Sequence, residues 1–434
     1  MDNLINVKAL ILAGGKGTRL AEITKNIIPK PLAKIAGKPI LERAVLQLKH
    51  YGVTDIFISV GHLNEKIRDY FGNGEKFGVN IEYIIENEPL GSGGALFYLK
   101  EKICDNLIVC PGDIVFDVDF NKMLDFHKKK NALITLFAHP NLHPYDSDLV
   151  ITDKEMRVTE INKKNSERNF FYKNIVNAGI FVLSPSTLSF FKELKPINME
   201  HDFVSSFIGS GKVFAYKSSE YVKDVGTLER FYAAEKDIER GIVAAKNLRN
   251  KQKAIFLDRD GTINKYKGFI KTTDDIELLP RVADAVKKIN SSEYLAIVIS
   301  NQPVIARGES TVGDVDRMFD KIETLLGQSG AYLDGVYYCP HHPHKGFDGE
   351  IKELKIDCDC RKPKIGLLRR AAEDFNLDLT KCIMMGDGET DVKTGKNAKI
   401  PTVLVKTGIQ EENSVTPDYY ADDLLSAVSI FIKD

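Results

Sequence analysis

The chain has 434 residues, 43% hydrophobic and 28% charged, a composition typical of a folded globular protein with two or three domains. Its 60 Lys and Arg residues nearly balance its 61 Asp and Glu residues, for a formal net charge of -1. This balance excludes a chain-wide basic surface for nucleic acid. No apolar run approaches the roughly 18–20 residues of a membrane helix, and Asp2 and Lys8 make a poor secretory signal. We therefore expect a cytoplasmic protein that acts on small molecules, with no nucleic-acid or membrane partner; the oligomeric state is left open.

Short apolar runs alternate with amphipathic stretches along the whole chain. The predicted strands are residues 9–12, 55–60, 81–85, 106–110, 132–138 and 179–183 in the first half, and 254–257, 295–300, 335–338, 382–385 and 402–405 in the second. Helical patterns lie between them, for example at 39–50 and 280–291. This alternation predicts an α/β protein with mostly parallel, doubly wound sheets, whose ligands bind at the carboxyl ends of the strands.

The segment 235–253 is rich in Ala, Lys, Glu and Arg, and it predicts a helix followed by a connector. We place a domain boundary near residues 242–252. The predicted domains are therefore 1–242 and 253–434.

A glycine-rich loop follows the first predicted strand, with the sequence Gly14-Gly15-Lys16-Gly17-Thr18-Arg19. Glycines let the backbone N–H groups approach a phosphate, and the Arg19 guanidinium can form paired hydrogen bonds with phosphate oxygens. Such a loop alone is weak evidence, because it also occurs as an ordinary turn.

Further residues favour a nucleotide site. Pro29 and Pro31 fix the path of the chain around Lys30, so that the cationic side chain of this lysine is held at a set position. The run 89–95, which contains Gly91, is a second loop with accessible backbone. Asp113, just after a predicted strand, is a carboxylate that could hold Mg²⁺, and Asp224 could supply a second one.

Together, these motifs make residues 7 to about 235 resemble the sugar-1-phosphate nucleotidyltransferase family, whose domains are Rossmann-like and similar to the GT-A fold. The motifs are GGxGTR-L, PKP, LGxGGA, GD, NAG and DxGT, in the family's order. The resemblance implies that Gly14, Gly15 and Gly17 line the nucleotide. By the same resemblance, Arg19 would hold the pyrophosphate leaving group and Lys30 would contact the reacting phosphates. Asp113 and Asp224 would bind Mg²⁺, and Asn177 and Gly179 would contact the sugar. The sugar phosphate would attack the α-phosphorus of a nucleoside triphosphate in line, and catalysis would consist of positioning and charge neutralisation.

One position departs from the family, which usually carries Glu-Lys after the strand that precedes the sugar pocket. Here the run is Asn162-Lys163-Lys164. Lys164 matches the phosphate-binding lysine. Lys163 replaces the glutamate, so the sugar-hydroxyl contact is left open; a solvated side chain is the alternative reading of Lys163.

The choice of base is weakly encoded. Guanine presents N–H donors at N1 and N2, and one carboxylate can accept both. Glu86 or Glu88, just before the Gly91 loop, could do this. The alternative is a surface glutamate.

The second half begins with another strand followed by an acidic loop, Asp258-Arg259-Asp260-Gly261-Thr262. Asp258 could attack phosphorus as a nucleophile, and Asp260 could protonate the leaving oxygen and then deprotonate water. The run Ser300-Asn301-Gln302 ends the next predicted strand and offers a hydroxyl and an amide to a phosphate. Arg361 and Lys362 supply cations, and the run 386–391, which contains Asp387, could complete a Mg²⁺ site.

Four motifs in this order make residues 253–425 resemble the haloacid-dehalogenase-type phosphatases, which have a Rossmannoid fold. The resemblance implies that Asp258 is the nucleophile and Asp260 the general acid and base. Mg²⁺ would be held by Asp258, Asp387 and the backbone carbonyl of Asp260. Ser300 and Lys362 would bind phosphate, and Asp391 would support the site from outside.

Four metal-binding residues follow in the spacing C-x-H, sixteen residues, C-x-C: Cys339, His341, Cys358 and Cys360. Three thiolates and one imidazole are typical of a tetrahedral structural Zn²⁺ site, which would order the Gly-, Lys- and Asp-rich stretch between them. Free cysteines near chance histidines are the alternative, and His342 could replace His341 as a ligand.

The combination CPHHP…CDCRKP narrows the resemblance to the D-glycero-D-manno-heptose 1,7-bisphosphate 7-phosphatase subfamily and its histidinol-phosphatase relatives, which lack a large cap domain. The family's Asn-Gln-Ser-Gly run is Asn301-Gln302-Pro303-Val304 here. Pro303 stiffens this loop, so the resemblance fixes the substrate less firmly than the chemistry.

The two resemblances together imply one pathway. The phosphatase half would remove the 7-phosphate from a heptose 1,7-bisphosphate, and the other half, which resembles heptose 1-phosphate guanylyltransferases, would couple the product to GTP. Mg²⁺ would serve both active sites. One alternative is a phosphatase for histidinol phosphate joined to a transferase for another sugar; another is that one half is a non-catalytic binding module.

Overall fold

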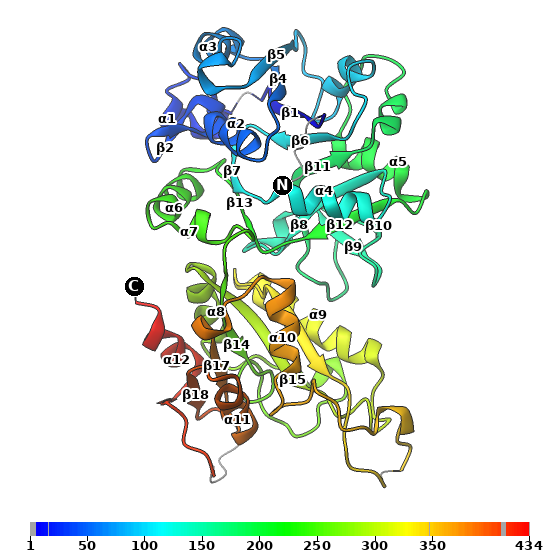
Figure 1. Cartoon of the computed structure of the whole chain (residues 1–434), viewed down its shortest axis with the longest axis vertical. Helices are drawn as coiled ribbons and strands as arrows, with labels where there is room; N and C mark the ends of the chain where they lie inside the picture. Colours follow the sequence, from blue (N-terminus) through cyan, green and yellow to red (C-terminus); the bar gives the residue numbers. More distant parts are fainter. Residues whose placement is uncertain (1–5, 16, 347, 409–413, 434) are drawn as a thin grey trace. The chain divides into compact units, whose positions relative to one another are not determined.

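The structure, a computed structural model, describes residues 6–15, 17–346, 348–408 and 414–433. Asp2 and Lys16, which the sequence analysis mentions, lie outside these ranges. The chain forms two compact units (Figure 1). The first comprises Met1–His139, Asp148–Lys163 and Ile175–Asn247, and the second comprises Pro140–Ser147, Lys164–Asn174 and Leu248–Asp434. Among the described residues, no helix combines the length and apolar character required to cross a membrane.

A mixed sheet of nine strands forms the centre of the first unit, in the order β10-β9-β11-β6-β1-β4-β5, with β8 pairing β11 and β12. The strands are β1 (Lys8–Ala13), β4 (Asp55–Val60), β5 (Asn80–Ile85), β6 (Leu107–Pro111), β8 (Ile134–His139), β9 (Leu149–Thr152), β10 (Val158–Asn162), β11 (Val176–Leu183) and β12 (Val213–Lys217). β1 pairs in parallel with β4 and β6, whereas β11 runs antiparallel to β6, β8 and β9. The prediction of a mostly parallel sheet is therefore wrong in detail here, because β9, β10 and β11 are joined by loops without a crossover helix.

Helices and short ribbons complete the first unit. The α-helices are α1 (Ala21–Thr24), α2 (Ile40–His50), α3 (Asn64–Phe71), α4 (Phe120–Lys129), α5 (Ser205–Ile208), α6 (Leu228–Glu239) and α7 (Ile242–Ala245). Shorter helical segments are η1 (Thr18–Leu20), η2 (Lys30–Leu32), η3 (Glu75–Phe77), η4 (Gly94–Leu99), η6 (Pro185–Phe190) and the π-helical η7 (Met199–Val204). Two-stranded ribbons pair β2 (Lys34–Ile35) with β3 (Lys38–Pro39), and β7 (Ile114–Asp117) with β13 (Tyr221–Asp224).

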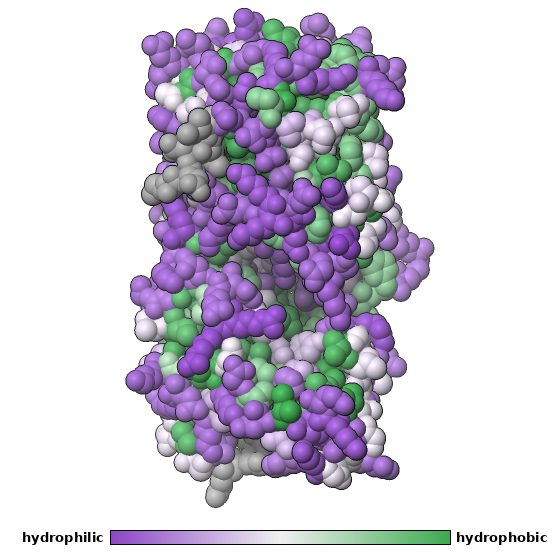
Figure 2. All heavy atoms as spheres, turned by 45° about the vertical axis from the view of Figure 1, so that its right-hand side comes forward, coloured by the Kyte–Doolittle hydropathy of each residue, from purple (hydrophilic) through white to green (hydrophobic). Residues whose placement is uncertain are grey.

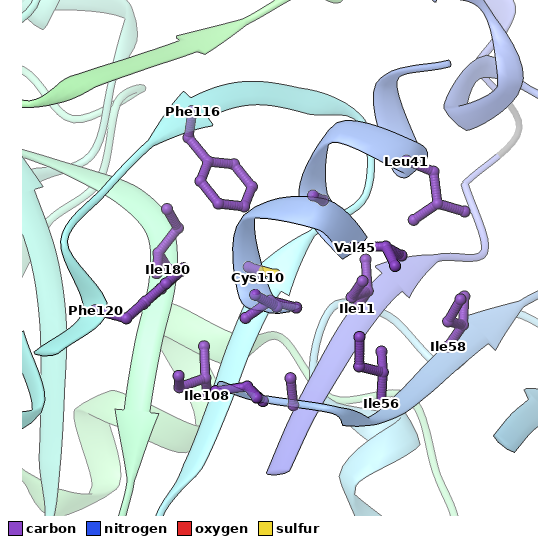
Figure 3. Packing of buried hydrophobic residues seen from close by; sticks show 14 of the residues in the cluster. Ile11, Leu41, Val45, Ile56, Ile58, Ile108, Cys110, Phe116, Phe120 and Ile180 are labelled. Carbon is purple, nitrogen blue, oxygen red and sulfur yellow. The ribbon is translucent and has the colours of Figure 1, made fainter. Parts of the chain in front are cut away.

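Helix α2 covers the strands that carry the glycine-rich loop. Its buried residues Leu41 and Val45 recur at i and i+4 and so lie on one face of the helix. Figure 3 shows both packed toward Ile11 of β1 and Ile56 and Ile58 of β4. This packing fixes the carboxyl end of β1, where the loop begins.

The second unit contains a six-stranded sheet in the order β16-β15-β14-β17-β18-β19, in which every described pairing is parallel. Its strands are β14 (Lys253–Leu257), β15 (Tyr294–Asn301), β16 (Gly335–Cys339), β17 (Ile383–Gly386), β18 (Thr402–Val405) and β19 (Tyr419–Ala421). Its helices are α8 (Val282–Asn290), α9 (Val312–Gln328), α10 (Gly366–Asp374), α11 (Glu389–Ala398) and α12 (Leu424–Phe431), with the short segments η5 (Pro144–Asp146), η8 (Thr273–Asp275), η9 (Lys352–Leu354) and η10 (Leu379–Lys381). The predicted α/β alternation is confirmed in this unit.

The predicted helix at 235–253 differs from the structure. Helix α6 begins earlier, at Leu228, and ends at Glu239, and the four-residue helix α7 follows it. Thr227 caps α6 by accepting a hydrogen bond from the N–H of Arg230, which is the start signal that the prediction missed.

On the face drawn in Figure 2, hydrophobic residues lie in small groups between hydrophilic ones.

Candidate active sites

The glycine-rich loop of the first unit approaches Lys30 closely. Gly17 has a φ of 62°, and a Cβ placed on it would lie 2.6 Å from Cβ of Lys30. Any larger residue would therefore strain the backbone and collide with the lysine. A Cβ on Gly14 would lie 3.2 Å from Oε1 of Glu86. The loop thus lies between the predicted phosphate-binding lysine and the predicted base-binding glutamate.

Lys30 joins the two predicted Mg²⁺ ligands of the first unit. Its Nζ lies 2.8 Å from Oδ2 of Asp113, which follows β6, and 3.5 Å from Oδ1 of Asp224, the last residue of β13. Lys30 is 5% exposed, whereas both carboxylates are partly exposed. A Cβ on Gly226 would lie 3.0 Å from Nη2 of Arg19 and 3.1 Å from both carboxylate oxygens of Asp224. The structure therefore brings four of the predicted charged residues into one group.

Arg230 belongs to the same group, and sequence reasoning missed it. Its Nη1 lies 3.0 Å from Oδ2 of Asp224. Arg230 lies in the first turn of α6, six residues after Asp224. An arginine three residues after the DxGT motif is the signal that could have identified it.

The two candidate base-binding glutamates differ. The carboxylate of Glu86 accepts hydrogen bonds from the hydroxyl of Ser59 and, at 3.1 Å, from the N–H of Leu90. Glu88 is exposed. The loop that contains Gly91 is fixed by the hydrogen bond from the N–H of Gly93 to the carbonyl of Ile197, at 2.9 Å. Glu86 is therefore the fixed carboxylate beside the glycine-rich loop.

The residues predicted to contact the sugar, Asn177 and Gly179, lie on β11. Asn177 accepts a hydrogen bond from the N–H of Gly179 at 3.1 Å, and its Nδ2 donates to Oε1 of Glu200 at 3.0 Å. Burial raises the pKa of Glu200, and the nearby Asp148 raises it further. Lys163 and Lys164 are exposed, and Lys164 opens the segment Lys164–Asn174 that is grouped with the second unit.

In the second unit, acidic side chains meet at the carboxyl ends of β14 and β17. Ligand oxygens of Asp258, Asp387 and Asp391 lie within 4.8 Å of one another. Gly261, in the turn after β14, has a φ of 77°, and a Cβ on it would lie only 2.3 Å from Oδ2 of Asp387. Only glycine fits this turn, and its absence of a side chain lets the two loops meet.

Lys362 is buried between two of these carboxylates. Its Nζ lies 2.8 Å from Oδ1 of Asp258 and 2.6 Å from Oδ1 of Asp391. Burial alone lowers the pKa of Lys362, but the two carboxylates more than offset this and raise it. Burial, followed by the charge of Asp391, raises the pKa of Asp258, which Lys362 opposes. The ammonium therefore holds the predicted nucleophile and its support together.

Asp260 has its own set of donors. Arg259 donates from Nε and Nη2, at 3.0 and 2.7 Å to Oδ1 and Oδ2 respectively. Asn264 Nδ2 donates to Oδ1 at 2.9 Å, and Gln302 Nε2 lies 3.4 Å from Oδ2. Gln302 also donates to Oγ of Ser300 at 2.9 Å, so it links Asp260 to the predicted phosphate-binding serine.

The predicted phosphate-binding residues are tied to one another. The side chain of Asn301 accepts from the backbone N–H of Lys362 at 3.0 Å and donates to its carbonyl at 3.1 Å. This pair anchors the backbone of Lys362 to the end of β15. Arg361 donates from Nη1 to the carbonyl of His341 at 3.1 Å. Asn301 thus fixes the lysine loop.

The four predicted Zn²⁺ ligands converge in the structure. Their ligand atoms all lie within 4.8 Å of one another. The Sγ–Sγ distances are 3.5 Å for Cys339–Cys358 and 3.3 Å for Cys339–Cys360 and Cys358–Cys360, and Nδ1 of His341 lies 3.3 Å from Cys360 and 3.7 Å from Cys339. For the alternative ligand, His342, Nδ1 lies 3.3 Å from the carbonyl of His344. The structure therefore groups His341, and not His342, with the three thiols.

Sequence comparison identifies the first half. The profile of the family described as "Nucleotidyl transferase" matches residues 8–241. The chain belongs to the nucleotidyl transferase family. In this nucleotidyl transferase, a second profile, "HAD-hydrolase-like", matches residues 359–427. The predicted fusion of the two families is confirmed.

Curated relatives match the second half of this nucleotidyl transferase. It is 39% identical to D-glycero-beta-D-manno-heptose-1,7-bisphosphate 7-phosphatase of Haemophilus influenzae. The aligned region of 176 residues covers 40% of this chain and 93% of the relative. The enzyme of the same name from Escherichia coli K12 is 37% identical over 166 residues, 38% of this chain and 83% of the relative. The chain is therefore bifunctional, with a nucleotidyltransferase domain and a phosphatase domain.

Solved structures resemble each part. HddC from Yersinia pseudotuberculosis is 29% identical and covers 53% of this chain and 99% of its own, with a TM-score of 0.46. D,D-heptose 1.7-bisphosphate phosphatase from B. bronchiseptica, solved with magnesium and phosphate, is 26% identical and covers 41% of this chain and 97% of its own, with a TM-score of 0.36.

Proposed function

We propose that this chain makes a nucleotide-activated heptose in two steps. The phosphatase domain, residues 253–434, removes the 7-phosphate of D-glycero-D-manno-heptose 1,7-bisphosphate. The nucleotidyltransferase domain, residues 1–242, then transfers GMP from GTP to heptose 1-phosphate and releases pyrophosphate. The observation that carries this proposal is the 39% identity of the second half to a heptose-bisphosphate phosphatase, in a chain whose first half is a nucleotidyl transferase. The first reaction yields a sugar 1-phosphate, which is the substrate class that we expect for the second.

The phosphatase reaction uses two carboxylates. An oxygen of Asp258 attacks phosphorus, the bond from phosphorus to the sugar oxygen breaks, and Asp260 gives its proton to that oxygen. Water then attacks the aspartyl phosphate and gives a proton to Asp260, and phosphate leaves Asp258 free. Ser300 and Lys362, with Arg361 and Asn301 beside them, bind the phosphate oxygens. The 2.8 Å contact between Lys362 and Asp258 supports this, because it places a cation beside the attacking atom.

Mg²⁺ fits the second unit. The converging carboxylates of Asp258 and Asp387, with the backbone carbonyl of Asp260, are oxygen donors of the kind that Mg²⁺ prefers. In the first unit, Asp113 and Asp224 would hold it, since both approach Lys30 from partly exposed positions. When bound, the ion neutralises phosphate charge.

Zn²⁺ fits the cysteine cluster. A tetrahedral ion with Zn–S bonds of about 2.3 Å separates its sulfur ligands by about 3.8 Å, close to the Sγ–Sγ distances of 3.3–3.5 Å here. Cys339, His341, Cys358 and Cys360 would hold the ion, which supplies structural order and no chemistry. Since Arg361 follows Cys360 and bonds to the carbonyl of His341, an ordered cluster would orient Arg361 and Lys362.

The transferase reaction needs no covalent intermediate. A phosphate oxygen of heptose 1-phosphate attacks the α-phosphorus of GTP, and pyrophosphate leaves. Lys30 and Arg19 bind the reacting phosphates and the leaving group, and the backbone of Gly14, Gly15 and Gly17 lines the nucleotide. The grouping of Lys30 and Arg19 around Asp113 and Asp224 supports the roles of these two cations.

Different residues contact the base and the sugar. Glu86 accepts the N1 and N2 donors of guanine beside the Gly91 loop; its fixed position against Gly14 supports this choice. Asn177, Gly179 and Lys164 contact the heptose 1-phosphate.

Phosphorus NMR tests the proposal. The purified chain is incubated with α-heptose 1,7-bisphosphate, Mg²⁺ and equal amounts of four nucleoside triphosphates. We expect inorganic phosphate, pyrophosphate and GDP-heptose alone among the nucleotide sugars. Phosphate without a nucleotide sugar would refute the transferase substrate, and no change would refute both.

Single substitutions separate the two reactions. Asp258→Asn should abolish phosphate release and leave pyrophosphate release from heptose 1-phosphate intact, and Asp113→Asn should do the reverse. The matched controls are Asp284→Asn on α8 and Asp125→Asn on α4, which make the same change at exposed positions. Loss of both activities in either active-site variant would contradict the two-site model.

A further inference from the structure

Arg259 stands out because it is charged and completely buried. It is 1% exposed and is among the largest fully buried side chains of the described chain. Sequence reasoning gave it no role, since it lies between the two aspartates of the DxDGT motif. A guanidinium taken out of water needs an anion or several acceptors to compensate for the lost hydration.

The only anionic side chain in its described contacts is Asp260. Nε lies 3.0 and 3.1 Å from Oδ1 and Oδ2, and Nη2 lies 2.7 Å from Oδ2, so the guanidinium forks onto the carboxylate. The rest of the group packs on apolar atoms: Nη1 lies 3.8 Å from Sδ of Met318, and the guanidinium carbon lies 5.4 Å from the centre of the Phe319 ring. Helix α9 therefore clamps Arg259 from the side away from Asp260.

The carboxylate of Asp260 has further fixed partners. Asn264 is fully buried and donates to Oδ1 at 2.9 Å, and Gln302 is 1% exposed and lies 3.4 Å from Oδ2. An aspartate side chain at the end of a strand has two free torsions. Here its orientation is set by the rigid fork of an immobile arginine.

We propose that Arg259 is a positioning residue for Asp260: it holds the carboxylate in the orientation from which a proton is exchanged with the leaving oxygen and with the attacking water. The inference rests on the proposed phosphatase mechanism. Arg259 itself touches neither phosphate nor nucleophile through its side chain. Without it, Asp260 keeps only its contacts with Asn264 and Gln302 and is held less firmly, and both proton transfers slow while the nucleophile Asp258 stays in place, held by Lys362.

The leaving group makes the test specific. A sugar alkoxide needs a proton as its bond to phosphorus breaks, whereas 4-nitrophenolate leaves as the anion and needs none. The second step, attack of water on the aspartyl phosphate, needs Asp260 as a base for both substrates. A variant that has lost only Asp260 positioning should therefore form the aspartyl phosphate quickly from 4-nitrophenyl phosphate and then stall.

The experiment measures the full chain with Mg²⁺ by rapid mixing. For Arg259→Met, we expect kcat on heptose 1,7-bisphosphate to fall about 100-fold or more, the typical contribution of general acid and base catalysis, with KM little changed. With 4-nitrophenyl phosphate we expect a burst of about one nitrophenolate per chain, followed by slow turnover. Asp260→Asn should reproduce this pattern, and Arg259→Lys, which keeps the charge but loses the fork, should lie between Arg259→Met and the unaltered chain.

Met318→Leu is the matched control, because Met318 contacts Arg259 in the same apolar pocket. It should behave as the unaltered chain. An equal loss in Met318→Leu, unchanged kcat in Arg259→Met, or a loss of the burst together with the turnover would each overturn the inference, the last by showing a general collapse of the site. If the unaltered chain hydrolyses neither substrate, the proposed function fails first and this inference with it.

Discussion

Replacing Lys362 with methionine should destabilise the second unit and abolish phosphatase turnover. The change removes the ammonium that lies 2.8 and 2.6 Å from the carboxylates of Asp258 and Asp391 and leaves one partly buried and one buried carboxylate facing each other. Removing one partner of a buried ion pair costs about 3–5 kcal/mol. For a unit of this size each kcal/mol lowers the melting temperature by about 2–4 °C, so we expect a decrease of about 6–20 °C.

Thermal unfolding by circular dichroism, without added Mg²⁺, measures this effect. Lys362→Met/Asp391→Asn should recover part of the loss, because the second change removes one of the two charges. Lys364→Met, which removes an exposed lysine paired with Asp357, is the control and should change stability by less than about 1 kcal/mol. A melting temperature of Lys362→Met equal to that of the control, or a double variant less stable than the single one, would refute the ion-pair reasoning.

Three further predictions concern other sites. Cys358→Ser should lower the bound zinc, measured by atomic absorption, and reduce phosphatase more than transferase activity; an unchanged zinc content would contradict the ligand set. Burial lowers the pKa of His127 from 6.5 to about 4, so the folded first unit favours neutral imidazole; its free energy of unfolding should fall by about 3 kcal/mol as the pH decreases from 6.5 to 4, at 1.36 kcal/mol per pH unit. His127→Gln should flatten that urea-unfolding profile, and an equally steep profile would rule out this histidine. Glu86→Gln should reduce the preference for GTP over ATP in competition assays by about 10-fold or more, the effect of about 1.4 kcal/mol; an unaltered preference would assign base selection elsewhere.

Patterns of apolar residues in the sequence predicted the helices and strands whose side chains pack against one layer of the buried core. The strands at 55–60 and 402–405 have the predicted bounds, since mostly apolar runs end there at polar or glycine-containing turns. The antiparallel strands β9 and β10 were missed because they have only four and five residues and no crossover helix separates them; the exposed residues of β10 are also polar. Residue order along the chain does not tell which neighbour such a strand will pair with.

The candidate sites likewise contain some features that the sequence predicted and others that it did not. The convergence of Cys339, His341, Cys358 and Cys360 was predictable because a metal site requires those residue types at short spacing. The fork of Arg259 onto Asp260 was not, because adjacent residues at a strand end usually point apart, and the burial of the arginine depends on α9, whose Met318 lies 59 residues further along the chain. The pairing of Asn301 with the backbone of Lys362 likewise depends on a loop 61 residues away.

The second unit is assembled from separate segments of the chain, and this affects where the chain could be shortened. Two of its segments, Pro140–Ser147 and Lys164–Asn174, come from within the range matched by the nucleotidyl transferase profile. The second of these segments is hydrogen-bonded to α9: the N–H of Tyr172 donates to Oγ1 of Thr324 at 2.9 Å, and the N–H of Asn174 donates to Glu323 at 2.7 Å. A protease cut or stop codon after Asn247 would therefore not release two intact units. It would deprive the phosphatase part of two of its own segments, and a gene split there would have to restore them by reassembly of the two fragments.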